Sequence, residues 1–207
     1  MSKTMHCYVV GSVISLVLLL GGCAPIQTTY YRPFIENGYY KGPCGGPDNF
    51  GATRLNEKLA YFVYVVTDGK DSVSATKIGI DLRVHPSSVL TLSTEAVVLN
   101  GSNYHVEIPI GGIHKREWKA DQQKLVQSEY NFSDQLIGYP ETNLPALTFG
   151  LSEIQRWGGF SFEIAMPPYL GDEFFVTLPR MKLDGEVVNS AVLKVRKVTG
   201  HHWQFIC

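Results

Sequence analysis

The sequence predicts an all-β protein, an antiparallel β-sandwich of the Ig-like or transthyretin-like class. Short runs from residue 59 onward alternate apolar and polar residues, which is typical of strands with one buried face. Three dipeptides that favour type I′ hairpin turns stand among these runs: Asp68-Gly69, Asn100-Gly101 and Asp184-Gly185. No segment keeps helical periodicity for more than about two turns. Many short strands with tight turns predict a sandwich of about eight or nine strands.

The expected strands differ in how many of their faces are buried. Leu59–Val66 is apolar on both faces, which suits a strand inside a sheet. The later runs carry apolar residues on one face. The apolar members are Ile78, Ile80, Leu82 and Val84; Val89 to Leu99; Tyr104, Val106, Ile108 and Ile110; Phe160, Phe162, Ile164 and Met166; Phe174, Val176 and Leu178; Leu193 and Val195; and Trp203 and Phe205.

The domain boundaries follow from changes in composition. Residues 1–22 read as a targeting segment, and residues 57–207 as the sandwich domain. Residues 23–56 are rich in Tyr, Gly and Pro without lasting strand periodicity, and predict a tether that becomes an extension packed on the domain near Cys44. The polar interval 111–146 interrupts the strand pattern and predicts a partly irregular insertion, functional or hiding short elements.

The N-terminal segment has the features of a signal peptide. A positive charge at Lys3 precedes an apolar run from Tyr8 to Leu20. About 13 residues are too few to cross a bilayer core of about 30 Å as a helix, but they suit the apolar region of a signal peptide. Leu20-Gly21-Gly22-Cys23 follows, with an apolar and two small residues before a cysteine.

This tetrapeptide resembles the lipobox of bacterial lipoproteins. The resemblance covers only the first two dozen residues, and implies cleavage before Cys23 and attachment of a diacylglycerol and an N-acyl chain such as palmitate. More than one chain gives stable anchoring. Ala24 stands where aspartate often retains such proteins in the inner membrane, so we expect an outer-membrane anchor with the domain facing the periplasm. The alternative is a plain secretory signal with an incidental cysteine.

Two cysteines, Cys44 and Cys207, remain for structural use. An even number of cysteines in an oxidising compartment predicts a Cys44–Cys207 disulfide. The alternative is a catalytic thiol at Cys207 with His201 or His202 as its base, which needs an orienting third group and a lowered thiol pKa.

Composition and motifs narrow the function classes. A formal net charge of −1 and the lack of a long basic run argue against nucleic-acid binding. The sequence contains no GxSxG, P-loop, HExxH or GxGxxG motif. His201-His202, His105 with Glu107, and the turn carboxylates Asp68, Asp71, Asp172 and Glu173 fit solvated strands and turns better than metal or acid–base sites. We therefore predict no catalytic residues, no metal and no cofactor.

Aromatic residues in the less regular segments are the better binding candidates: Trp118, Tyr130, Tyr139, Trp157, Tyr39 and Tyr40. Tyr and Trp are favoured anchors at interfaces. The other reading is that these side chains pack their own segments onto the sandwich.

The leading functional hypothesis is a non-enzymatic envelope structural or protein-interaction module, bound to the membrane through Cys23 and to an unidentified envelope protein. The alternative is a glycan- or small-molecule-binding domain, or a hydrolase acting on envelope polymers. A concave pocket with convergent polar groups near residues 111–146 would favour that alternative.

Overall fold

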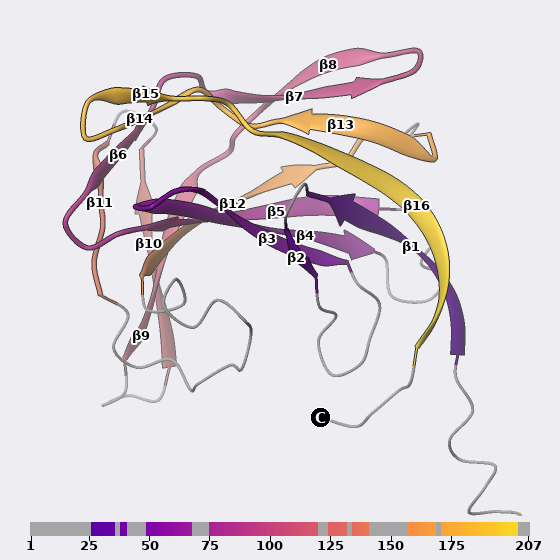
Figure 1. Cartoon of the computed structure of the whole chain (residues 1–207), viewed down its shortest axis with the longest axis horizontal. Helices are drawn as coiled ribbons and strands as arrows, with labels where there is room; N and C mark the ends of the chain where they lie inside the picture. The colour runs from indigo at the N-terminus through magenta and orange to yellow at the C-terminus, as the bar shows by residue number, and fades with distance from the viewer. Residues whose placement is uncertain are drawn as a thin grey trace, which may run out of the picture.

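The computed structural model describes residues 26–35, 38–40, 49–67, 75–119, 124–131, 134–140, 157–168 and 171–202. In these residues the chain is all-β and forms three sheets in which every pairing is antiparallel (Figure 1). The predicted all-β antiparallel class is confirmed, and the layering fits a β-sandwich. The Ig-like or transthyretin-like class stays a prediction. No helix in the described ranges is long and apolar enough to span a membrane.

The first sheet has five strands in the order β1-β16-β13-β7-β8. Its members are β1 (Ile26–Phe34), β16 (Val192–His202), β13 (Glu173–Thr177), β7 (Ala96–Gly101) and β8 (His105–Pro109). β1 pairs with β16 along its whole length, from Ile26 opposite His202 to Phe34 opposite Lys194. The first and the last described strands are therefore direct neighbours in one sheet.

The second sheet has seven strands in the order β10-β9-β12-β5-β4-β3-β2. They are β10 (Lys124–Tyr130), β9 (Ile113–Lys119), β12 (Gly158–Ala165), β5 (Ala75–Val84), β4 (Leu59–Thr67), β3 (Phe50–Asn56) and β2 (Tyr39–Tyr40). Figure 1 shows β12, β5, β4 and β3 as a layer beneath β7, β13 and the beginning of β16. β4 lies between β3 and β5, as its two apolar faces predict.

A third sheet of four short strands lies beside these layers, in the order β11-β6-β14-β15. They are β11 (Leu136–Ile137), β6 (Val89–Leu92), β14 (Met181–Leu183) and β15 (Glu186–Val188). The run from Val89 to Leu99 is thus two strands in different sheets, since β7 belongs to the five-stranded sheet.

The core lies between the inward faces of the sheets. The predicted inward residues of β5, β12, β13 and β16 are all buried: Ile78, Ile80, Leu82, Val84, Phe160, Phe162, Ile164, Phe174, Val176, Leu193 and Val195. Alternation along a strand puts these residues on one face, and their removal from water is the main favourable contribution to folding.

The predicted turns have different outcomes. Asp184 and Gly185 join β14 to β15 with φ of 54° and 87°, which confirms a type I′ turn. Asn100 and Gly101 instead end β7, and the chain turns at residues 102–104. A Cβ on Gly101 would lie 2.1 Å from Cε1 of Tyr104, so the tyrosine ring, and not a turn, requires glycine there. Asp68-Gly69, Trp203 and Phe205 lie outside the described residues.

The predicted irregular segments contain more strand than expected. β1 and β3 lie within residues 23–56, where the sequence predicts a tether and packed extension, and β9, β10 and β11 lie within 111–146. In β1 the neighbours Tyr30 and Tyr31 are both buried, and Tyr31 packs on Phe174 with ring centroids 5.8 Å apart. Aromatic residues at adjacent positions hide the alternation by which strands are recognised.

Candidate binding cleft

The cleft is built around the tight hairpin of β14 and β15. The left-handed conformation of Asp184 is one that Asp tolerates and Gly185 adopts freely. Because two residues make the turn, Leu183 pairs with Glu186 and Met181 with Val188. Directly paired residues share a face of the sheet, so Glu186 and Val188 point to the same side as the buried Leu183 and Met181.

The Asp184 carboxylate connects this hairpin to two other parts of the fold. Its Oδ1 accepts a hydrogen bond from the Val89 backbone N–H at 2.9 Å. Its Oδ2 accepts from Ser88 Oγ at 3.1 Å and from Lys58 Nζ at 2.9 Å. The Val89 hydrogen bond, followed by that of Lys58, lowers the Asp184 pKa below its ordinary value of 3.8. The carboxylate is therefore held in its charged form at neutral pH.

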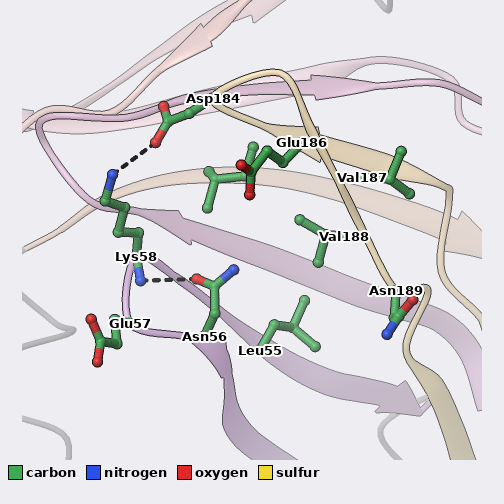
Figure 2. A pocket seen from close by; sticks show the side chains of 10 residues that line it. Leu55, Asn56, Glu57, Lys58, Asp184, Glu186, Val187, Val188 and Asn189 are labelled. Carbon is green, nitrogen blue, oxygen red and sulfur yellow. Dashed lines mark hydrogen bonds and ion pairs between the residues drawn. The ribbon is translucent and has the colours of Figure 1, made fainter.

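The opposite wall is the turn between β3 and β4. Asn56 Oδ1 accepts a hydrogen bond from the Lys58 backbone N–H at 2.9 Å, an arrangement that stabilises tight turns. The Lys58 carbonyl accepts from the His85 N–H at 2.9 Å, which fixes the turn to the end of β5. The lysine side chain then reaches Asp184 (Figure 2), so the ion pair joins the two walls at one end.

A cleft of about 650 Å³ opens between these walls. Such a volume is within the range of small-ligand sites. The lining residues come from two short segments: Leu55, Asn56, Glu57 and Lys58, and Leu183, Asp184, Glu186, Val187, Val188 and Asn189. Figure 2 shows Glu186 and Val188 of the hairpin on one side of the cleft and Leu55 of β3 on the other, with the Lys58–Asp184 pair at one end.

The cleft has an excess of negative charge. Its lining carries three carboxylates and one ammonium group, and the ammonium group of Lys58 already contacts Asp184. Within the part of the chain that the structure describes, neither Glu57 nor Glu186 has an ion-pair partner. Both glutamates are exposed, so they can meet a positively charged ligand without first breaking an internal bond.

A second polar group lies on the outer face of the seven-stranded sheet. Arg83 donates to Asp81 Oδ2 through Nη2 at 2.6 Å and Nε at 3.1 Å, and through Nη1 to the Trp157 carbonyl at 3.0 Å. Its guanidinium lies 5.3 Å from the centroid of the Phe62 ring. Asp81 Oδ1 is buried without a hydrogen-bond partner in the described structure, and a Cβ on Gly159 would lie 2.6 Å from it. Because backbone fills the space beside this oxygen, the group reads as structural.

Three of the predicted aromatic residues, Trp157, Tyr130 and Tyr139, do not line the cleft. Trp157 is only 4% exposed, and its ring makes an edge contact with His85 at 5.4 Å. Tyr130 and Tyr139 each make a T-shaped contact with the buried Phe160, with ring centroids 5.9 Å apart. These three side chains pack against other residues of the sandwich.

The remaining predicted site residues are less fully described. Tyr39 and Tyr40 form β2, and Trp118 lies on β9 opposite Leu125. Their side chains, together with Cys23, Cys44 and Cys207, lie outside what the structure describes. The lipidation and the disulfide therefore stay predictions.

The histidines are dispersed. His105 lies on β8, and its Nδ1 is 2.6 Å from Asn100 Oδ1. His201 is exposed on β16 opposite Gln27. Among the residues that the structure describes, no group of three His, Cys, Asp or Glu side chains could hold a metal ion.

Sequence reasoning missed Glu57, Lys58 and Glu186. The sequence predicts Asp184 as a turn residue, but no local pattern reveals that its carboxylate contacts a lysine 126 positions away. Comparison with family models, with curated proteins and with solved structures gives no match for the chain.

Proposed function

We propose that this chain is a lipid-anchored envelope protein, attached through Cys23 to the outer membrane, whose sandwich faces the periplasm and binds another envelope protein without catalysing a reaction. The lipobox resemblance of Leu20-Gly21-Gly22-Cys23 supports the anchor. A diacylglycerol with an N-acyl chain would hold the protein stably at the membrane.

The position of β1 carries the proposal. β1 begins at Ile26 and pairs with β16 over nine residues. Three residue steps separate Cys23 from Ile26, so the extended chain between them spans at most about 10 Å. A lipid on Cys23 would therefore hold the sandwich directly against the membrane surface. This arrangement suits a module that presents a fixed surface to a neighbouring component.

The cleft favours protein binding over the alternative of a glycan-binding or hydrolytic domain. The alternative expects a concave pocket near residues 111–146, whereas the described residues that line this cleft all lie outside that interval. The cleft is instead bordered by β15, the last strand of its sheet. Terminal strands with an open edge are sites at which other chains can pair.

The anchor is tested by the intact mass of the mature protein purified from bacterial membranes. We expect the chain to begin at Cys23 and to carry the mass of a diacylglycerol and one acyl chain. A Cys23→Ser variant is the matched control, and should lose the lipid and its membrane association. An unmodified Cys23 in the purified protein would contradict the anchor.

The interaction is tested by crosslinking the full-length protein in intact cells, followed by purification and mass spectrometry. We expect one envelope protein to be recovered in a fixed ratio with the lipoprotein. Recovery of the lipidated, abundant protein with no stoichiometric partner would contradict the interaction module. Turnover of an envelope polymer by the purified protein would establish the hydrolase instead.

A further inference from the structure

We propose that the cleft between the β3–β4 turn and the β14–β15 hairpin binds an extended, positively charged segment of a partner protein, which adds as a strand beside β15. The inference rests on the proposed function, because it names the chemistry of the partner. The observations behind it are the edge of β15 that pairs with no described strand, the apolar residues along the cleft, and two glutamates without an ion-pair partner in the described part of the chain.

β15 offers backbone groups for pairing. Among the described strands it is the terminal strand of its sheet and pairs only with β14. In a two-residue hairpin the residues that flank the turn, here Leu183 and Glu186, exchange hydrogen bonds with each other. The N–H and carbonyl of Val187, one residue further on, must then point away from β14. Its side chain is 71% exposed, so nothing described covers this position.

The edges of the five-stranded sheet are less suited to such pairing. Its terminal strands β1 and β8 contain Pro33 and Pro109. Proline has no N–H, and its presence on an edge strand prevents a second chain from forming a regular ladder there. β15 carries no proline, and a cleft follows its length. Its three residues are few, so the cleft must supply part of the binding energy.

The cleft supplies contacts at the spacing of a strand. Glu186 and Val188 are two residues apart and point to the same side, across from Leu55 (Figure 2). Side chains of an added strand also alternate with a period of two. Two partner side chains that are two residues apart therefore face the cleft together. One can contact the apolar Leu55 and Val188, and the other can contact the carboxylate of Glu186.

The charge of the cleft identifies the kind of side chain. Lys58 is held by Asp184 at 2.9 Å, which leaves Glu57 and Glu186 as the lining carboxylates without an ion-pair partner in the described residues. Complementary charge selects partners and repels wrong ones. The cleft therefore favours a segment with a lysine or arginine two positions from an apolar residue, and disfavours an acidic segment.

The test measures peptide binding to the full-length protein in detergent micelles by fluorescence anisotropy. The probe is a short capped peptide in which lysine and valine alternate along one face of the extended chain and threonine occupies the other face, and the comparison peptide replaces lysine by glutamate. We expect saturable binding of the lysine peptide only. The double variant Glu57→Gln/Glu186→Gln should weaken it by about three- to tenfold, because exposed ion pairs are individually weak. Glu107→Gln, an exposed carboxylate on β8, is the matched control and should bind normally.

A second measurement separates strand addition from simple charge attraction. N-methylation of alternate peptide nitrogens removes backbone donors from one edge of the probe without changing the protein. We expect one of the two methylation patterns to abolish binding. Equal binding of both methylated peptides, or an unchanged affinity of the double glutamine variant, would overturn the proposal. The mass at Cys23 is independent of these results, so failure of the cleft proposal and failure of the anchor are distinguishable.

Discussion

Asp184 and Val89 are joined by two hydrogen bonds that run in opposite directions. The Asp184 N–H donates to the Val89 carbonyl at 2.8 Å, and the Val89 N–H donates to Asp184 Oδ1 at 2.9 Å. This double contact fixes the β14–β15 turn to the start of β6. Because Lys58 binds the other carboxylate oxygen, the same residue also fixes the distance between the two walls of the cleft.

The Asp184 contacts predict a pH dependence of stability. Its pKa is lowered in the folded protein, chiefly by the Val89 N–H. The charged carboxylate therefore stabilises the fold at any pH above 3.8, the ordinary pKa of the group. This contribution is lost as the pH falls through the lowered pKa. We expect Asp184→Asn to lower the melting temperature at neutral pH and to approach the wild type in strong acid. Thermal unfolding across the pH range measures this, and a constant difference at every pH would contradict it.

Gly185 should be hard to replace for reasons of backbone conformation alone. Its φ is 87°, and an added Cβ would meet no atom within 4 Å. Gly185→Ala should therefore cost about 1–2 kcal/mol through the left-handed conformation and not through a clash. Gly111 also has open space, without a positive φ. Gly111→Ala is the control and should change the free energy of unfolding by less than about 0.5 kcal/mol in urea titrations.

The Asp81–Arg83 pair should behave as a buried ion pair. The two side chains are 11% and 17% exposed and approach to 2.6 Å. Arg83→Met leaves the Asp81 charge without its partner and should cost about 3–5 kcal/mol. The double variant Asp81→Ala/Arg83→Met should cost clearly less than the sum of the two single variants. A double-mutant cycle by urea unfolding measures this coupling, and additive losses would show that the pair contributes nothing specific.

Two phenylalanines give a matched comparison of core and surface. Phe162 on β12 is fully buried, whereas Phe175 on β13 is 39% exposed on the outer face of the other sheet. Phe162→Ala should cost about 3–5 kcal/mol, because it leaves a cavity in a packed core. Phe175→Ala should cost less than about 1 kcal/mol. Similar losses for both would contradict the assignment of the core between the two sheets.

The predicted disulfide can be tested by free-thiol labelling of the purified protein. A Cys44–Cys207 bond would leave both residues unlabelled before reduction. It would close a loop of about 160 residues, and its loss in Cys44→Ser/Cys207→Ser should cost at most about 5 kcal/mol. The serine variants separate the effect of the bond from general effects of a reductant. Labelling of both thiols in oxidised protein would refute the pairing.

The sequence predicts those parts of the fold that depend on local pattern. The alternation from Ile78 to Val84 correctly identifies the buried face of β5, and Asp184-Gly185 correctly marks a hairpin. β1 is not predicted from the sequence, because its pairing partner β16 lies about 170 residues later in the chain. Thr29 on β1 and Thr199 on β16 show this pairing, since their hydroxyl oxygens lie 3.0 Å apart.

The candidate site was harder to predict than the fold. Glu57, Lys58 and Glu186 look like ordinary solvated turn residues in the sequence, and only the packing of two distant hairpins turns them into a cleft. Tyr and Trp are favoured anchors at interfaces, so the sequence marks the aromatic residues as binding candidates. Tyr130 and Tyr139 instead cover Phe160, a role that depends on strand pairing across β9 and β12.

The continuous pairing of β1 with β16 also has a mechanical meaning. In a chain held by a lipid at Cys23, any pull between the membrane and a bound partner enters the domain through the first residue of β1. A pull along the strand loads the nine residue pairs from Ile26 to Phe34 together and not one after another. The ladder that places the sandwich near the membrane would thus also be the element that resists its extraction under tension.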